Sequence, residues 1–276
     1  MPEVIERDVQ TGDGRMLHTF DSGGDGPVVL FHHGSPATGA LLPPVLAAAS
    51  VRGVRLIGYA RPSYGGSTAA PGRDVAAAAG DVAAILDHLG VQTCGTFGAS
   101  GGGPHALACA GLLPDRVRAV ATLAGIAPYS EEYDWFSGMA APGALRAARA
   151  GRGARAHFAE TEEFDPSVFV DADWAALQGE WAQLGADAGA AGAAGPDGLV
   201  DDDVAFASDW GISLDALTVP AWFVHGELDR MVPVSHARAM LSACPTGELW
   251  LRPRDGHVSV LSAVPVVLDW LLAQPR

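Results

Sequence analysis

A serine stands at the centre of a glycine-rich pentapeptide, residues 98–102, directly after an apolar run. The letters GASGG match the G-x-S-x-G pattern of a serine on a sharp turn between a strand and a helix. Such a turn strains the serine backbone and admits only small residues two positions to either side. A helix that begins after Ser100 would direct its partly positive end, and the amide of Gly101, at a forming negative charge. The pattern predicts Ser100 as a nucleophile and Gly101 as an oxyanion donor, although by itself it fits an ordinary tight turn equally well.

A second turn, residues 33–36 (HGSP), follows the apolar run at 27–32. At the carboxyl edge of an open sheet, where ligands bind, the backbone amide of Ser35 would be a second oxyanion donor. His33 in the same turn is a candidate substrate contact. His32 and His33 do not suggest a metal site, because neighbours on a strand point to opposite faces and no third ligand is suitably spaced. We expect no metal and no cofactor.

Asp229 and His257 each follow a predicted strand near the end of the chain. Taken singly, Asp229 fits a turn residue that caps a helix, and His257 fits a surface histidine. Taken with Ser100, they give the order Ser, Asp, His and fall at one edge of the sheet. The sequence therefore predicts a triad in which His257 is the base of Ser100 and Asp229 orients His257.

Strand-length apolar runs alternate with helical patterns on both sides of a long interruption, which is typical of a sheet covered by helices. Asp74 can cap the start of the helix at 75–89, and Gly90 can end it. We predict strands at 27–32, 54–58, 94–98, 117–123, 221–226 and 248–252, and helices at 75–89, 235–243 and up to about 274, with a further helix after Ser100.

The interruption, residues 129–206, is predicted to be a helical lid on a core formed by residues 1–128 and 207–276. Residues 129–210 hold 16 of the 32 acidic residues and 4 of the 17 basic ones, so this region carries a charge of −12 out of −15. We expect a solvated acidic surface, with Arg146, Arg149, Arg152 and Arg155 on a solvated face. The Gly/Ala run at 185–198 predicts short helices with mobile connections. Because the triad and oxyanion donors all lie outside it, the lid should be separable from the catalytic core.

The lid should select the substrate, and its negative charge favours neutral or cationic molecules. Aromatic side chains bury first, so most of its large apolar residues should form the lid's own core. The candidates for lining an apolar pocket are Trp135, Phe136, Met139, Phe158, Phe164 and Phe169.

Composition excludes several classes of function. The chain has a net charge of −15 and no lysine, which argues against nucleic-acid binding. Residues 1–14 lack the apolar region of a signal peptide, and no run of about 18 apolar residues predicts a membrane span. Three separated cysteines suggest reduced thiols in a cytoplasmic protein. A small-molecule substrate is the expected partner, and the sequence leaves the oligomeric state open.

Over nearly its whole length the chain resembles the α/β-hydrolase superfamily, through residues 33–36, 98–102, 226–233 and 255–257. The resemblance implies a mostly parallel sheet flanked by helices, with a helical lid inserted before the strand that bears the catalytic acid. It also implies acyl transfer through a covalent Ser100 ester, with no cofactor. Haloalkane dehalogenases and epoxide hydrolases of this fold use aspartate as nucleophile, so Ser100 makes those activities unexpected.

Residues 59–67 (YARPSYGGS) are also similar to proline iminopeptidase-like members, in which an aspartate usually occupies the position of Ala60. Those peptidases usually have tryptophan after the elbow glycine, whereas Gly102 and Gly103 follow in this chain. A carboxylic ester hydrolase is therefore favoured over an aminopeptidase. Its substrate would be a small neutral ester, lactone, thioester or amide. An acyltransferase, lyase or cyclase on the same scaffold, or a receptor that retains the triad, stays open.

Overall fold

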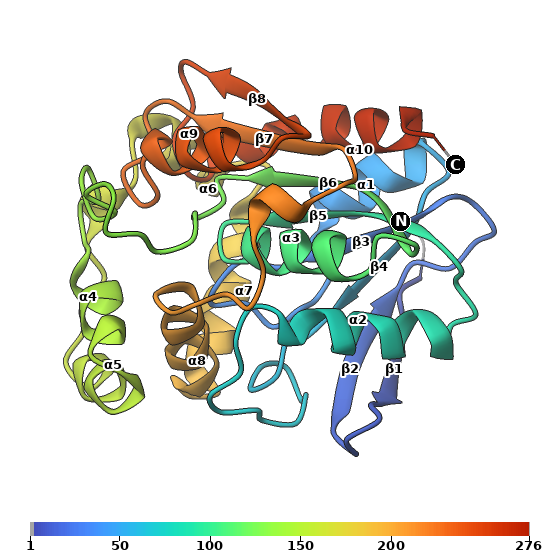
Figure 1. The fold of residues 1–276 in the computed structure, drawn as a ribbon, viewed down its shortest axis with the longest axis horizontal. Coiled ribbons are helices and arrows are strands. Elements are labelled where there is room, and N and C mark those ends of the chain that lie inside the picture. The colour runs from blue at the N-terminus through green and yellow to red at the C-terminus, as the bar shows by residue number, and fades with distance from the viewer. Residues whose placement is uncertain (1–2, 276) are drawn as a thin grey trace.

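A computed structural model describes residues 3–275, and an eight-stranded sheet forms its centre (Figure 1). The strand order is β1-β2-β4-β3-β5-β6-β7-β8. β1 and β2 pair antiparallel with each other, and β2 pairs antiparallel with β4, whereas the remaining neighbours are parallel. The strands are β1 (Ile5–Gln10), β2 (Met16–Asp21), β3 (Val28–His32), β4 (Arg55–Tyr59), β5 (Cys94–Ala99), β6 (Val117–Leu123), β7 (Ala221–Gly226) and β8 (Gly247–Arg252).

The predicted strands agree with the observed ones to within a residue or so at each end. The inner strands β3, β5 and β6 are apolar along most of their length because helices cover both of their faces. The sequence analysis did not predict β1 and β2. β1 is an edge strand with five exposed residues out of six, so its sequence (IERDVQ) carries little apolar periodicity.

Two layers of helices enclose the sheet (Figure 1). One apolar core joins side chains of α2, α3 and α9 to the sheet, and a second core joins those of α1 and α10 to it. The α2 boundary follows the sequence prediction, because the Asp74 carboxylate accepts from the Ala77 amide at 2.8 Å and Gly90 adopts a φ of +66° after the helix. These helices are α1 (Pro43–Val51), α2 (Ala77–His88), α3 (Gly102–Leu112), α9 (Val234–Ala243) and α10 (Val264–Ala273).

The segment between β6 and β7 is helical, and it contributes to both cores. Trp135 and Phe206 pack into the core beside α3, and Trp181 packs into the core beside α10. Its helices lie beside the sheet without adding a strand to it (Figure 1). They are α4 (Gly143–Arg149), α5 (Arg152–Ala159), α6 (Asp171–Gln178), α7 (Ala182–Ala193) and α8 (Asp197–Phe206), with a short 3-10 helix η1 (Pro166–Val168).

The helices of this segment are short, as expected, and the longest, α7, has 12 residues. The Gly/Ala run forms most of α7, because its alanines sustain the helix despite Gly185, Gly189 and Gly192. The expectation for the arginine series is wrong in part. Arg146 and Arg149 are exposed as expected, but Arg155 is fully buried and pairs with Asp203 at 2.6 Å and Glu162 at 2.8 Å. The spacing of arginines in the sequence is the same whether they face water or buried carboxylates. The sequence pattern therefore could not distinguish a solvated arginine from a buried, paired one.

No helix within residues 3–275 is both long enough and apolar enough to span a membrane.

Candidate active site

Ser100 lies on a tight turn between β5 and α3. Its φ of +51° belongs to the left-handed region, which is strained for a residue with a side chain. A Cβ on Gly98 would lie 2.1 Å from the Gly102 carbonyl oxygen, and a Cβ on Gly102 would lie 2.1 Å from the His32 carbonyl oxygen. The predicted need for small residues at both positions is confirmed. Backbone therefore packs closely on both sides of the turn and holds Ser100 in its strained conformation.

The side chains of Ser100, His257 and Asp229 form a continuous hydrogen-bonded row. His257 Nε2 lies 2.9 Å from Ser100 Oγ, and His257 Nδ1 lies 2.8 Å from Asp229 Oδ2. The other carboxylate oxygen of Asp229 accepts from the amides of Met231 at 2.9 Å and Val232 at 2.8 Å. With Asp229 ionised, the proton of neutral His257 sits on Nδ1, which leaves Nε2 free to accept the Ser100 proton.

The surroundings of His257 favour its charged form once a proton arrives. Burial opposes that charge, but the charge and hydrogen bond of Asp229 outweigh burial and raise the pKa of His257 above its usual value, with Asp173 contributing. His225, whose Nε2 lies 3.5 Å from Asp229 Oδ2, stays neutral because burial lowers its pKa. Asp255 is the nearest acid along the chain, but it pairs with Arg252 rather than with His257.

The two predicted oxyanion donors, Ser35 and Gly101, lie next to each other. A Cβ built on Gly101 would come within 2.4 Å of Ser35 Oγ and 2.9 Å of the Phe206 ring. Within residues 3–275, neither the Ser35 nor the Gly101 amide donates a hydrogen bond to a protein acceptor. Both amides are therefore available for a negative oxygen that forms on a group bound at Ser100.

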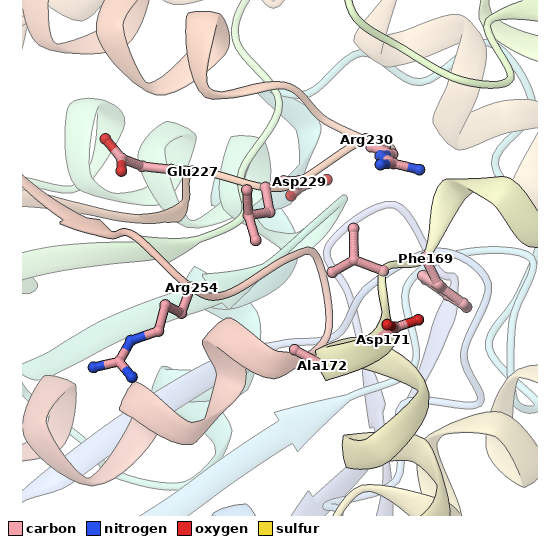
Figure 2. A pocket seen from close by; sticks show the side chains of 9 residues that line it. Phe169, Asp171, Ala172, Glu227, Asp229, Arg230 and Arg254 are labelled. Carbon is pink, nitrogen blue, oxygen red and sulfur yellow. The ribbon is translucent and has the colours of Figure 1, made fainter.

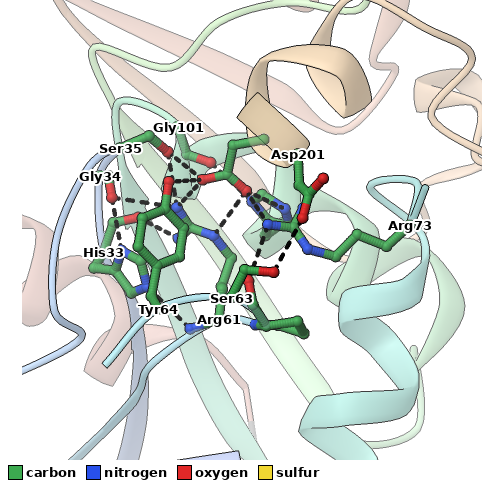
Figure 3. Close-up of polar contacts among 12 residues, drawn as sticks. His33, Gly34, Ser35, Arg61, Ser63, Tyr64, Arg73, Gly101 and Asp201 are labelled. Carbon is green, nitrogen blue, oxygen red and sulfur yellow. Dashed lines mark hydrogen bonds and ion pairs between the residues drawn. The ribbon is translucent and has the colours of Figure 1, made fainter. Parts of the chain in front are cut away.

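Arg61 supports the oxyanion turn from beneath (Figure 3). Its buried guanidinium donates to the His33 carbonyl, to the Gly34 carbonyl at 3.2 Å and to Ser35 Oγ at 2.8 Å. It also pairs with Asp202 at 2.6 Å, and the Ser35 hydroxyl donates to the same carboxylate. The turn is thus held by an arginine from the core and a carboxylate from α8.

Asp202 is fully buried among opposite charges. Burial disfavours its ionised form, but Arg61 and Arg73, the latter at 2.7 Å, hold the pKa of Asp202 well below its usual range. Tyr64 donates a further hydrogen bond at 3.0 Å. The sequence prediction did not include Asp202, although the run of three aspartates at 201–203 was a usable signal. All three pair with arginine: Asp201 with Arg152, Asp203 with Arg155, and Asp202 with the two arginines named above.

A second buried carboxylate of the inserted segment, Asp173 of α6, meets the loop that carries His257. It accepts hydrogen bonds from the amides of His257 at 3.2 Å and Val258 at 2.8 Å. Together with Asp202, it gives the segment buried polar contacts with the core that the expectation of a separable lid did not include. Carboxylates from within residues 129–206 hold both the oxyanion turn and the histidine loop.

The remaining predicted substrate contacts have structural roles. His33 is buried with both ring nitrogens paired, Nδ1 with the Gly34 carbonyl at 2.6 Å and Nε2 with the Arg61 amide at 3.1 Å. Trp135 is buried and donates to the Ala127 carbonyl at 3.0 Å, and Met139 is buried in the same core. Phe136 stacks under the Arg146 guanidinium, 4.2 Å from ring centre to cation. Packing accounts for these four side chains without a substrate.

A cleft of about 710 Å³ is lined by Asp229 but not by Ser100 or His257 (Figure 2). It separates the start of α6 from the loop after β7, and Phe169 is the one predicted pocket residue that lines it. Its exposed charges balance, with Asp171 and Glu227 against Arg230 and Arg254. The full lining is Phe169, Val170, Asp171, Ala172, Glu227, Leu228, Asp229, Arg230 and Arg254.

No group of three or more His, Cys, Asp or Glu side chains within residues 3–275 is arranged to hold a metal ion. Cys94, Cys109 and Cys244 are all buried free thiols. Burial raises the pKa of Cys94 to about 12 and that of Cys109 well above its usual value, so neither thiol is activated as a nucleophile.

Comparison with known proteins shows which family has this architecture. The family model described as alpha/beta hydrolase fold matches residues 27–264, so the chain belongs to that family. Its fold is similar to that of an esterase from Thermogutta terrifontis, with 23% identity, 97% of this chain and 98% of that chain covered, and a TM-score of 0.72. A bromoperoxidase from Bacillus anthracis matches at 23% identity, with 97% and 99% covered and a TM-score of 0.77. An enol-lactonase from Burkholderia xenovorans LB400 matches at 21% identity, with 96% and 100% covered and a TM-score of 0.73.

At these identities the solved structures establish the fold alone. Family membership supports a hydrolase in general, and the bond that this chain cleaves is a matter for proposal.

Proposed function

We propose that this protein is a serine hydrolase that cleaves a small neutral carboxylic ester, lactone, thioester or amide through an acyl-enzyme on Ser100. The observation that carries the proposal is the row Ser100 Oγ, His257, Asp229, joined at 2.9 Å and 2.8 Å on a strained turn. Nucleophile and base are within hydrogen-bond reach, and a third group orients the base.

In the first half of the reaction, Ser100 Oγ attacks the substrate carbonyl carbon while His257 Nε2 takes the hydroxyl proton. The carbonyl oxygen becomes negative and receives hydrogen bonds from the Ser35 and Gly101 amides. The bond to the leaving group breaks as His257 returns the proton to it. In the second half, water adds to the acyl carbon, His257 takes its proton, and Ser100 leaves with that proton as the acid is released.

The choice of a small neutral substrate rests on charge. The chain as a whole carries −15, which disfavours the approach of anions.

The test is stoichiometric labelling with a fluorophosphonate, followed by a screen of short p-nitrophenyl esters. The proposal expects one label per chain, located on Ser100, and turnover of at least one ester. A lyase or an acyltransferase would label without hydrolysing esters, and a receptor would label poorly or turn over once. Absence of both labelling and turnover in the folded protein would overturn the proposal.

A further inference from the structure

The carboxylate of Asp173 is a point of convergence between the inserted segment and the loop that bears His257. Its side chain is fully buried. Oδ1 accepts from the Val258 amide, the Ser259 amide and the Ser259 hydroxyl, each at 2.8 Å. Oδ2 accepts from the His257 amide at 3.2 Å and from the Val170 amide at 3.1 Å. Five donors from two separate parts of the chain thus meet on one side chain.

These five hydrogen bonds compensate for the burial of the Asp173 carboxylate, so no cation is needed beside it. No ion pair to Asp173 is found in the described range, residues 3–275, whereas the buried carboxylates Asp202 and Asp203 each pair with arginine. A carboxylate accepts hydrogen bonds at both oxygens, and charge-assisted bonds to amides are among the stronger hydrogen bonds in proteins. The loop therefore supplies the polar partners that make burial of Asp173 favourable.

The bonded amides belong to three consecutive residues at the start of the 3-10 helix η3 (Ser259–Ala263). Amides at a helix start have no partner within the helix, so Asp173 fixes the direction in which this loop leaves β8. The chain also passes very close, since a Cβ on Gly256 would lie 2.1 Å from Asp173 Oδ2. The backbone of His257 is therefore held on one side by Asp173, while its ring is held on the other by Asp229.

We propose that Asp173 is a positioning residue for the base: its carboxylate fixes the backbone of residues 257–259 so that the His257 ring faces both Ser100 and Asp229. The proposal rests on the proposed function. Asp173 touches no reacting atom and acts through His257. It makes the inserted segment part of the catalytic apparatus, because α6 supplies the side chain on which the loop is anchored.

Asp173 also contributes charge to the environment of His257. The ionisable groups that face this ring or its loop are Asp229 on the loop after β7, Asp173 on α6 and His225 on β7, and His225 is neutral. Removing the negative charge of Asp173 while keeping its shape should lower the pKa of His257. By contrast, a purely structural contact would alter stability and leave this pKa unchanged.

The decisive variant is Asp173→Asn, with Asp171→Asn as the matched control. Asp171 lies two residues earlier on the same helix, and its side chain is exposed. The titration of His257 is followed by NMR in histidine-labelled protein, with the His257 signal assigned by its loss in His257→Gln. The rate of phosphonylation of Ser100 is measured across the same pH range. Ser259→Ala, which removes one of the five donors and leaves four backbone amides on Asp173, is a milder companion variant if Asp173→Asn is unstable.

The proposal expects the His257 pKa to fall by a few tenths of a unit to about one unit in Asp173→Asn. The plateau rate of phosphonylation should fall by about 10- to 100-fold, because a small displacement of the base has effects of this size. Ser259→Ala should shift the rate in the same direction by less, and Asp171→Asn should match the parent.

A folded Asp173→Asn protein with the parent's His257 pKa and a phosphonylation rate within about threefold of the parent would overturn the proposal. An equal effect of Asp171→Asn would overturn it as well, since the response would then reflect the general charge of α6. Failure of the parent to react at Ser100 would instead refute the proposed function, and the NMR titration distinguishes these cases because it needs no turnover.

Discussion

Asp202 accepts a hydrogen bond from the hydroxyl of Ser35, a residue 167 positions earlier in the chain. This contact joins α8 of the inserted segment to the turn that carries Ser35, a proposed oxyanion donor. Phe206, one helical turn beyond Asp202, packs against Gly101, the other donor. One face of α8 therefore covers this turn with a buried charge and an aromatic ring.

Asp202→Asn should destabilise the protein and slow its chemistry. The variant leaves Arg61 and Arg73 buried without a counter-charge, a loss of about 3–5 kcal/mol of unfolding free energy when a buried pair is broken. The pKa of Asp202 is held low, so its stabilising effect is fully present above the unfolded pKa of about 3.9 and is lost only as the pH falls through the lower folded value. Urea unfolding at pH 7 and at pH 5 measures the free energy.

Ser35 would also lose its carboxylate partner in Asp202→Asn, so phosphonylation of Ser100 should slow by up to about 100-fold, the lower end of the effect of losing one oxyanion donor. Asp197→Asn is the control, because Asp197 starts the same helix and forms an exposed pair with Arg152. If the two variants had equal free energies of unfolding, the buried ion pairs of Asp202 would contribute no more to stability than the exposed pair of Asp197.

Ser100→Ala should abolish hydrolysis and leave the fold intact. The turn requires a small residue with positive φ and close glycine neighbours, but no hydrogen bond from the serine hydroxyl holds the backbone. Loss of a triad serine lowers kcat by about four to six orders of magnitude. Ester hydrolysis within tenfold of the parent, in a variant with the parent's circular dichroism and melting temperature, would refute Ser100 as nucleophile.

Activity should fall in acid with an inflection above the reference pKa of about 6.5. His257 acts as base only when neutral, and Asp229 raises its pKa, so the protonated, inactive form persists to higher pH than in a free histidine. The measurement is the pH dependence of kcat/KM for the best ester from the screen. A flat profile from pH 5 to pH 9 would assign the proton transfer to another group.

Asp229→Asn should lower kcat by about four orders of magnitude. An asparagine at this position has one acceptor oxygen for the Met231 and Val232 amides, so its NH₂ group would face His257 Nδ1 and force the proton onto Nε2. Histidine in that tautomer cannot accept the Ser100 proton. Asp255→Asn is the control, because Asp255 pairs with Arg252 and should be nearly silent.

Replacement of residues 129–206 by a short Gly/Ser linker should now prevent folding, contrary to the expectation from sequence. The deletion removes Asp173 and Asp202 and takes Trp135, Trp181 and Phe206 out of the two cores. Solubility, cooperative unfolding and fluorophosphonate labelling are the readouts. A soluble core that labels at the parent's rate would show that the segment is separable after all.

The sequence by itself determined the parts of this protein that local chemistry encodes. Glycines at 98 and 102 permit one kind of turn, apolar runs such as 117–123 suit a strand buried on both faces, and the order of Ser100, Asp229 and His257 places three reactive side chains at one sheet edge. The turn and strand signals lie within short stretches of chain, where residue type and spacing reflect backbone conformation directly.

Only the tertiary structure decided how the inserted segment is used. The sequence shows Asp173, Asp202 and Arg155 as ordinary charges on an acidic segment, and the fold buries all three. Whether a charge meets water or a distant partner depends on contacts over a hundred residues or more, such as Asp202 with Arg61, and no local pattern encodes those contacts. Burial then makes these charges structural, because a charge removed from water must be paired or hydrogen-bonded.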